Sequence, residues 1–308
     1  MKLLFCSHLD DPHEWIPELK RHMPDLEIDV WPEVKDSAAI DAILVWIPPE
    51  GGLAQFHNLK AIQSLGAGVN QLDLKSLPHG VPVARLVDPG LTVSMRDYCV
   101  WAVLRHYRGL DSHAANQPQK KWVYYIPPPK SAVSVGVMGL GELGGEVARV
   151  ATDLGFSVRG WARSPKTIER VACFWGPEGL AAFAGKTDIL ICLLPLTVET
   201  RGILARPLFE MLPKGARVIN VGRGDHLVER DLLDALESGR IASATLDVFA
   251  REPLPPEHPF WSHPKITVTP HVAAFGSAVT AASVVVENLR RALARRPLLN
   301  QVDIDRGY

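Results

Sequence analysis

The chain has 308 residues, of which 47% are hydrophobic and 22% charged, enough for two hydrophobic cores of ordinary domain size. Its 33 lysines and arginines nearly balance its 34 aspartates and glutamates, and no long run of one sign occurs. This balance argues against a nucleic-acid partner or an anionic membrane surface, so a small molecule is the expected partner.

The four cysteines, Cys6, Cys99, Cys173 and Cys192, lie far apart in or beside apolar segments and form no C-x-x-C pair. This spacing favours reduced, buried thiols over a disulfide framework or a zinc site. The apolar run "ILICLLPL" at residues 189–196 falls well short of the roughly 18 residues that a membrane-spanning helix needs. The sequence therefore predicts a soluble, cytoplasmic protein.

The first hundred residues alternate short apolar runs with more polar segments. This alternation predicts an α/β fold in which helices cover a parallel sheet. The expected strands are "KLLFCS", "LEIDVW", "AILVWI", "LKAIQSL" and "VPVARL".

From Met95 the pattern changes to a longer amphipathic stretch, residues 95–117, which predicts a helix between two domains. The proline-rich "YYIPPPK" that follows predicts a linker. A second alternating series starts at Ala132 and predicts another parallel sheet, buried on both faces. A last helix is expected over residues 277–297, where the basic end suits the C-terminal dipole, and it is expected to return to the first domain.

The stretch "VGVMGLGELGGEVARV" at residues 135–150 sets three glycines between a strand-like and a helix-like run. Gly139 permits a tight turn, Gly141 lets the backbone approach a pyrophosphate, and Gly144 allows the helix to pack closely on the strand. The helix N-terminus adds a favourable dipole. We interpret the segment as a dinucleotide-binding loop; the alternative is a plain strand-to-helix turn.

About twenty residues further on, an acid that binds the ribose hydroxyls of NAD is expected, but none is present. Ala162, Arg163 and Ser164 stand there instead, with Lys166 close by. A guanidinium and a hydroxyl can bind the 2′-phosphate of NADP, which a carboxylate would repel. The sequence therefore predicts that NADP(H) is preferred over NAD(H); the alternative is that Arg163 is only a solvated charge at a strand end.

Three residues follow the ends of predicted strands, where ligands of open parallel sheets bind. They are Arg223 in "RVINVGRGD", Glu252 in "ATLDVFAREP" and His271 in "ITVTPHVAA". Arg223 can polarise a carbonyl, His271 can donate a proton to the developing alkoxide, and Glu252 can orient the imidazole. Each has a structural alternative, but together, beside a dinucleotide loop, they predict hydride transfer to a 2-keto acid.

Over almost its whole length, the chain resembles the D-isomer-specific 2-hydroxyacid dehydrogenases, most of all their glyoxylate/hydroxypyruvate reductase A branch. The matching motifs are "LGAGVNQ", "VGVMGLGELG", "GWARS", "LLPLT", "NVGRGDHLVERDLLDAL", "TLDVFAREPLP", "TPHVAA" and "QVDIDRGY". The resemblance implies two Rossmann-like or flavodoxin-like domains. The cofactor domain, residues 98–276, is inserted in a discontinuous substrate-binding lid domain, residues 1–97 and 277–308.

The resemblance also implies a homodimer, formed through the helix-and-arm region that begins near Met95. It assigns the catalytic roles above to Arg223, Glu252 and His271. It assigns cofactor binding to Gly139, Gly141, Glu142, Leu143, Gly144, Arg163, Ser164, Lys166, Leu194, Pro195, Val221, Gly222 and Asp247, the last on the nicotinamide carboxamide. It assigns substrate binding to Trp46 and to the backbone N–H groups of Gly66, Ala67 and Gly68, besides Arg223 and His271.

The chain departs from the family pattern after "TPHVAA", where Phe275 and Gly276 replace the usual threonine or similar polar residue. The cluster "SHLDDPH" brings His8, Asp10, Asp11 and His13 close in sequence, but a helix cap followed by Pro12 explains these residues without a metal.

Two functions fit these patterns. The first is an NADPH-dependent reductase of glyoxylate, hydroxypyruvate and related small 2-keto acids. The alternative is a nicotinamide-nucleotide-sensing, corepressor-like binding protein on the same scaffold. The presence of all three chemical residues favours the enzyme.

Overall fold

The computed structural model describes residues 1–304, 306 and 307, and it divides into two compact units. Unit 1 comprises Met1–Leu91 and Phe275–Tyr308, and unit 2 comprises Thr92–Ala274. The predicted domain boundaries, after residues 97 and 276, lie a few residues later than those of the structure, after Leu91 and Ala274. At the first boundary a single helix runs from one unit into the other and leaves no break in the sequence pattern. Asp305 and Tyr308, in the ending "QVDIDRGY", lie outside the described residues.

Unit 1 is built on a parallel sheet of five strands in its described part. From edge to edge the strands are β2 (Glu27–Val30), β1 (Lys2–Cys6), β3 (Ala42–Val45), β4 (Ala61–Ser64) and β5 (Val83–Ala84). This is the flavodoxin-like order, in which the strand order reverses between β1 and β3: β2 lies on one side of β1, and β3, β4 and β5 follow on the other. The reversal leaves the loops after β1 and β3 next to each other.

Two helices cover one face of this sheet. They are α1 (Pro12–His22) and α8 (Ala278–Leu293), which pack on each other and on the apolar face of the strands. Asp11 caps α1 by accepting the N–H of His13 at 2.8 Å, and Pro12 opens the helix, so the expected capping role of "DDPH" is confirmed. Arg290 and Arg291 lie in the last turn of α8, where the dipole favours positive charge.

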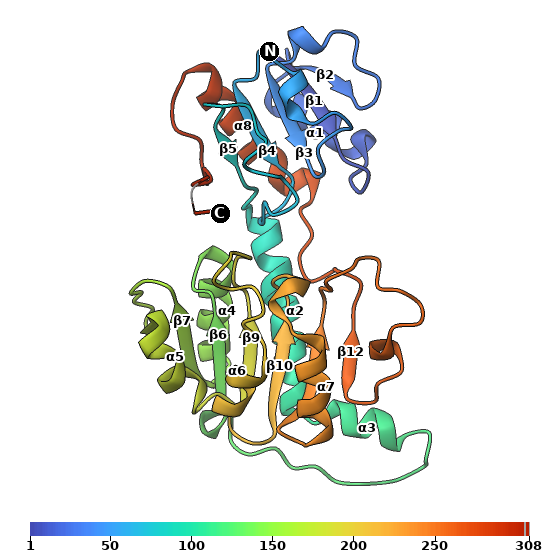
Figure 1. The fold of residues 1–308 in the computed structure, drawn as a ribbon, viewed down its shortest axis with the longest axis vertical. Helices are drawn as coiled ribbons and strands as arrows, with labels where there is room; N and C mark the ends of the chain where they lie inside the picture. The colour runs from blue at the N-terminus through green and yellow to red at the C-terminus, as the bar shows by residue number, and fades with distance from the viewer. Residues whose placement is uncertain (305, 308) are drawn as a thin grey trace. The chain divides into compact units, whose positions relative to one another are not determined.

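Unit 2 contains a seven-stranded parallel sheet in its described part. Figure 1 shows β10, β9, β6 and β7 side by side. The order is β12 (Ile266–Val268), β11 (Ile241–Leu246), β10 (Ala216–Asn220), β9 (Ile189–Cys192), β6 (Ser134–Met138), β7 (Ser157–Ala162) and β8 (Val171–Trp175). The two halves diverge at β6 and β9, which is the Rossmann arrangement; the predicted α/β class with two parallel sheets is confirmed.

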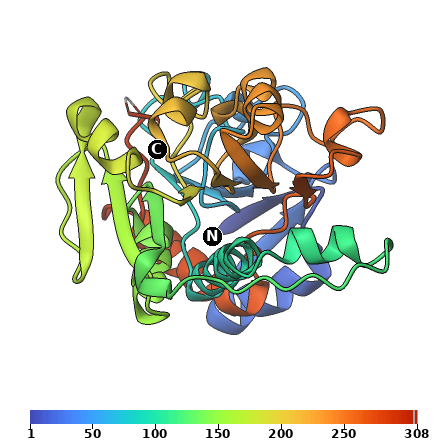
Figure 2. The same cartoon turned by 90° about the horizontal axis from the view of Figure 1, so that it is seen from below.

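Helices cover both faces of this second sheet, so its central strands are buried, apart from half-buried Arg217 in β10. Figure 2 shows α6 and α7 on one side and α4 with the teal α2 on the other. The four helices are α6 (Arg206–Met211), α7 (Glu229–Glu237), α4 (Glu142–Asp153) and α2 (Pro89–Tyr107), and α5 (Gly176–Ala184) packs beside β7 and β8.

The predicted helix over residues 95–117 is wrong in its bounds. The structure has two helices instead. Helix α2 begins earlier, at Pro89, and ends at Tyr107, and the separate helix α3 (Leu110–Asn116) follows it. Gly109 between them has φ +64°, a left-handed conformation that glycine tolerates and that ends the first helix. Neither α2 nor any other helix in the described part of the chain is long and apolar enough to cross a membrane.

Candidate active site

Three neighbouring strands of unit 2 each carry one predicted catalytic residue just past the carboxyl end. Arg223 follows β10, Glu252 follows β11 and His271 follows β12, and these strands pair in that order. Nδ1 of His271 lies 2.7 Å from Oε2 of Glu252, and the charge of Glu252 acts on Arg223. The structure thus brings the three side chains to one edge of the sheet.

The Glu252 carboxylate fixes the proton on one imidazole nitrogen. Burial raises the pKa of Glu252, but hydrogen bonds from His271 and from the N–H of Phe249, with the charges of His271 and Arg223, outweigh burial and lower the pKa overall. An ionised carboxylate can only accept, so Nδ1 of His271 is the donor. Nε2 is therefore the atom that can exchange a proton with a substrate.

The backbone of His271 is in an unusual conformation, with φ +56°. Its N–H donates to the backbone carbonyl of Asp247 at 2.9 Å. The Asp247 carboxylate accepts the N–H groups of Val272 and Ala273, each at 2.8 Å, and the hydroxyl of Thr269 at 2.6 Å. These bonds hold a left-handed conformation that side chains rarely adopt, and they fix the direction of the imidazole.

Asp247 is 1% exposed, and burial raises the pKa of its carboxyl despite these hydrogen bonds. Tyr98 of α2 extends the network, because its hydroxyl lies 2.6 Å from that of Thr269. The structure therefore gives Asp247 the task of holding the His271 loop. Its expected contact with the nicotinamide carboxamide stays a prediction.

Arg223 lies in a tightly packed loop between two glycines. A Cβ on Gly224 would lie 1.8 Å from the carbonyl carbon of Phe249, so only glycine fits there. The Arg223 guanidinium donates from Nη1 to the carbonyl of Gly222 at 2.7 Å. Burial lowers the pKa of Arg223, and the nearby Glu252 charge opposes that effect. The loop leaves a partly buried guanidinium beside the Glu252–His271 pair.

The glycine loop after β6 has the close contacts that its sequence predicts. Gly139 has φ +100°, and a Cβ on it would lie 2.6 Å from the carbonyl oxygen of Leu193. A Cβ on Gly144 would lie 1.8 Å from the carbonyl oxygen of Gly139, whereas one on Gly141 would meet nothing within 4 Å. No side chain caps α4, which starts at Glu142. The loop thus leaves open space at an uncapped helix N-terminus, where a pyrophosphate fits.

The predicted phosphate-binding residues lie at the same end of the sheet. Arg163, Ser164 and Lys166 follow β7 and are exposed, and β7 is tied to the glycine loop by the bond from the N–H of Gly139 to the carbonyl of Trp161, at 2.8 Å. Exposed Glu199 is close enough for the Arg163 charge to act on it. Its pKa is lowered, first by a hydrogen bond from Thr197 and last by Arg163.

The loops after β9 and β10 lie against each other beside the glycine loop. The N–H of Val221 donates to the carbonyl of Cys192 at 3.2 Å, and a Cβ on Gly222 would lie 3.2 Å from the carbonyl oxygen of Leu194. Pro195 follows in the same loop. The four predicted cofactor residues, Leu194, Pro195, Val221 and Gly222, therefore lie in two loops that contact each other.

The predicted substrate-binding residues of unit 1 also lie together. Trp46 follows β3 at the reversal point of the sheet, and a Cβ on Gly66 would lie 2.4 Å from Cζ3 of its indole. The N–H of Gly66 already donates to Oγ of Ser64 at 3.1 Å. The remaining N–H groups of this loop, on Ala67 and Gly68, are thus the better candidates for an anionic substrate group.

Residues 100–273 match the family model described as "D-isomer specific 2-hydroxyacid dehydrogenase, NAD binding domain". Glyoxylate/hydroxypyruvate reductase A of Yersinia enterocolitica is 43% identical over 314 residues, and the match covers 100% of both chains. The chain belongs to the D-isomer specific 2-hydroxyacid dehydrogenases. It is therefore an oxidoreductase that uses a nicotinamide cofactor.

Two solved structures of this family are similar to this dehydrogenase. One, from Xanthobacter autotrophicus in complex with NADPH and MES, has a TM-score of 0.95 at 42% identity and covers 100% of this chain and 99% of that one. The other is the NADPH-dependent glyoxylate/hydroxypyruvate reductase of Sinorhizobium meliloti in complex with NADP and sulfate. It has a TM-score of 0.92 at 37% identity, and the match covers 100% of both chains.

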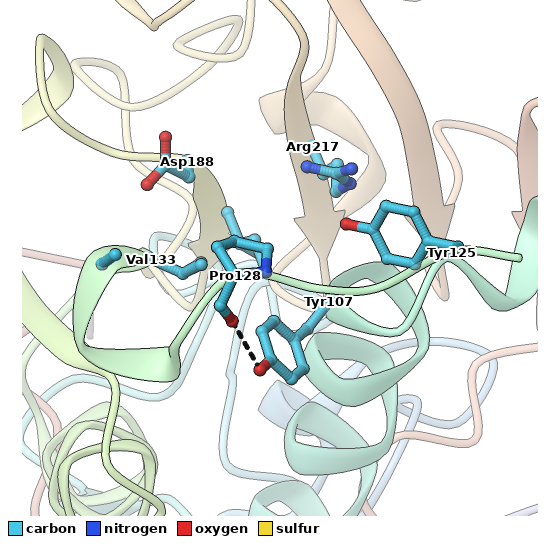
Figure 3. Close-up of a pocket in the computed structure, with 8 residues that line it drawn as sticks. Tyr107, Tyr125, Pro128, Val133, Asp188 and Arg217 are labelled. Carbon is cyan, nitrogen blue, oxygen red and sulfur yellow. Dashed lines mark hydrogen bonds between the residues drawn. The ribbon is translucent and has the colours of Figure 1, made fainter.

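The dehydrogenase also has a pocket of about 170 Å³ away from this site. Figure 3 shows Asp188, Arg217 and two tyrosines lining it, with the Tyr107 hydroxyl bonded to the carbonyl of Pro128 at 2.8 Å. Asp188 precedes β9, and Arg217 lies near the start of β10, so the pocket is at the amino ends of the strands. Ligands of such sheets bind at the opposite, carboxyl ends.

Proposed function

We propose that this dehydrogenase uses NADPH to reduce glyoxylate, hydroxypyruvate and related small 2-keto acids to 2-hydroxy acids such as glycolate and D-glycerate. The observation that carries the proposal is the 2.7 Å pair of Glu252 and His271 beside Arg223, at the sheet edge that also holds the glycine loop. The names of the similar proteins support the same reaction.

The three side chains have different roles in this reaction. NADPH supplies the hydride that reaches C2 of the keto acid. The Arg223 guanidinium polarises the keto oxygen and attracts the carboxylate, and Nε2 of His271 donates the proton that converts the alkoxide into a hydroxyl. Glu252 stabilises the positive charge that the imidazole carries before it donates.

The residues of unit 2 fit a bound NADP(H). The open space at Gly141 and the uncapped N-terminus of α4 suit the pyrophosphate. Arg163, Ser164 and Lys166 offer positive charge and a hydroxyl to the 2′-phosphate, and Ala162 brings no repelling carboxylate. We infer a preference for NADP(H) over NAD(H) from this arrangement and from the NADPH and NADP complexes of the similar structures.

The experiment that tests this function measures NADPH oxidation with a panel of small 2-keto acids, with glyoxylate and hydroxypyruvate first. Consumption of NADPH that requires the keto acid supports the reductase. Tight binding of NADPH without turnover on any keto acid would instead support the sensing, corepressor-like protein.

We expect Trp46 to limit substrate size, since its indole packs against Gly66 in the loop after β4, which is proposed to bind the substrate carboxylate. Glyoxylate has no C3 group and hydroxypyruvate only a hydroxymethyl, whereas phenylpyruvate would have to displace the indole. Trp46→Ala should raise kcat/KM for phenylpyruvate relative to glyoxylate, with about 1 to 3 kcal/mol of discrimination at stake. The ratio of the two kcat/KM values before and after substitution is the measurement.

Trp175→Ala is the matched control for Trp46, because Trp175 is 52% exposed at the end of β8 in the other unit. It should leave the ratio unchanged. An unchanged ratio in Trp46→Ala as well would remove Trp46 from the substrate pocket.

We also propose that the dehydrogenase is a homodimer and that the segment of residues 121–129 contacts the second copy. This segment has no regular secondary structure. It exposes 86% of Trp122, 82% of Tyr124 and 87% of Ile126, and clustered exposed apolar side chains of this kind mark association surfaces.

The double variant Trp122→Ser, Ile126→Ser is expected to sediment as a monomer at concentrations at which the unaltered protein sediments as a dimer. Leu9→Ser, which removes an isolated exposed leucine of unit 1, is the control and should stay dimeric. A monomeric unaltered protein, or a dimeric double variant, would contradict the proposal.

We further propose a cytoplasmic location. Cys6, Cys99 and Cys192 are buried free thiols, and Cys173 is a partly exposed one, which suits a reducing compartment.

A further inference from the structure

His226 is a fully buried histidine that connects two loops of the proposed active site. It lies in the turn after Arg223, and its side chain is 0% exposed. Nδ1 lies 3.0 Å from the backbone nitrogen of Arg223, and Nε2 lies 3.2 Å from the carbonyl oxygen of Pro195. One imidazole thus joins the loop after β10, which carries Arg223, to the loop after β9, which faces the proposed cofactor.

The two partners determine the protonation of this imidazole. A backbone N–H can only donate, so Nδ1 carries no proton; a carbonyl can only accept, so Nε2 carries one. His226 is therefore neutral, as the Nε2–H tautomer. Burial, together with the charge of Arg223, lowers the pKa of His226, which agrees with a neutral ring.

A second side chain holds the other side of Arg223. Nδ2 of Asn220, at the end of β10, donates to the carbonyl of Arg223 at 3.0 Å, and Oδ1 accepts the N–H of Gly222 at 3.2 Å. Both the N–H and the carbonyl of Arg223 are thus bound by side chains. Asn220 fixes the residue to its own strand, whereas His226 fixes it to the neighbouring loop.

The imidazole of His226 is closely packed between the two loops. A Cβ on Gly222 would lie 2.9 Å from Nδ1 and 3.0 Å from Cε1 of the ring. The backbone of His226 accepts the N–H of Leu204 at 2.8 Å, and the carbonyl of Pro195 also accepts the hydroxyl of Thr200 at 2.7 Å. A displacement of either loop would therefore be transmitted through the imidazole.

We propose that His226 is a positioning residue for the reduction, which sets the Arg223 guanidinium relative to the loop that faces the cofactor. The inference rests on the proposed function, since it assumes that Arg223 acts on the keto acid. Loss of the imidazole should lower kcat much more than it weakens NADPH binding. The proposed pyrophosphate and 2′-phosphate sites lie on the loops after β6 and β7, whereas displacing a reacting group by about 1 Å can cost on the order of 100-fold in rate.

The test compares His226→Leu, which removes both polar atoms, with His226→Gln, which keeps one acceptor and one donor. We expect His226→Leu to lower kcat for glyoxylate about 10-fold to 100-fold, with the Kd for NADPH changed by less than about threefold. His226→Gln should restore most of kcat. His226→Asn keeps the polarity but is too short to reach both partners, so it should resemble His226→Leu and replaces it if that variant does not fold.

The control is His106→Leu. His106 is 1% exposed, and its ring nitrogens lie 3.0 Å from the hydroxyls of Ser243 and Thr245 of β11; Nδ1 also lies 3.4 Å from the Asp111 carboxylate. These partners lie outside both active-site loops, so His106 matches His226 in burial and in having a partner at each ring nitrogen. This variant should lose stability but keep kcat per folded molecule.

A second readout needs no turnover. Amide hydrogen exchange of the cofactor-free protein should become faster in the peptides that cover residues 193–204 and 221–228 in His226→Leu, but not in His106→Leu. Normal kcat and unchanged exchange in the folded His226 variants would overturn the proposal, and so would an equal loss of kcat in His106→Leu. An unaltered protein without reductase activity would refute the proposed function, whereas the exchange result would still report on the link between the loops.

Discussion

Replacing His271 by alanine is expected to lower kcat for glyoxylate by about two orders of magnitude or more, the usual effect of removing a positioned general acid. The Kd for NADPH should change little, because the pyrophosphate and phosphate sites lie on other loops. The expectation follows from the 2.7 Å bond between Nδ1 and Glu252, which leaves Nε2 as the proton donor. Steady-state kinetics and NADPH fluorescence titration measure the two quantities.

His258→Ala is the matched control for His271→Ala. His258 pairs with Glu229 at 3.2 Å, so it is also a histidine beside a carboxylate in unit 2, but it does not follow the end of a strand of the sheet. Its removal should leave kcat within about threefold of the unaltered value. Near-normal turnover of folded His271→Ala across neutral pH would show that another group is the acid.

Changing the end of β7 is expected to alter the cofactor preference. The unaltered protein should have a higher kcat/KM for NADPH than for NADH. The double variant Ala162→Asp, Arg163→Ala should bind NADPH more weakly by about 1.5 to 3 kcal/mol, the range for a lost charged hydrogen bond. Binding of NADH should be spared, since an acid at this position can accept hydrogen bonds from the ribose hydroxyls.

Arg170→Ala is the control for this change, because Arg170 is an exposed arginine that pairs with Asp153 at 2.5 Å and does not follow β7 directly. Its substitution should leave both Kd values unchanged. If the unaltered protein used NADPH and NADH with equal kcat/KM, the inferred role of Arg163 and Ser164 would be wrong.

The sequence predicts the main architecture because local patterns determine it. Central strands such as β6 and β9 are buried on both faces, so each is an unbroken apolar run. The requirement for Gly144 is equally local, since a Cβ there would meet the carbonyl oxygen of Gly139 in the same loop. A Cβ on Gly139 would instead meet Leu193 in the loop after β9, but its φ of +100° also favours glycine. Arg223, Glu252 and His271 could be selected because each follows such a run.

Other features could not be predicted because they depend on distant partners. The edge strand β8 is not among the predicted strands, although its sequence VACFW is wholly apolar. Unlike the central strands it has no buried residue, since three of its residues are half-buried and two are exposed. The role of Asp247 depends on a loop more than twenty residues away. The role of His226 could not be predicted for the same reason. Its partner Pro195 lies 31 residues earlier, and the sequence "GRGDH" does not indicate that contact. The signal in the sequence is limited to a histidine three residues after a candidate catalytic arginine.

The most direct test of the proposed reaction is to follow a deuterium label from C4 of NADPH into the product. The protein is incubated with the labelled NADPH and glyoxylate, and the glycolate formed is analysed by mass spectrometry. One deuterium on C2 of glycolate, formed in step with NADPH oxidation and lost in His271→Ala, is the predicted result. Bound NADPH with no labelled glycolate would contradict the assignment of this chain as a glyoxylate reductase.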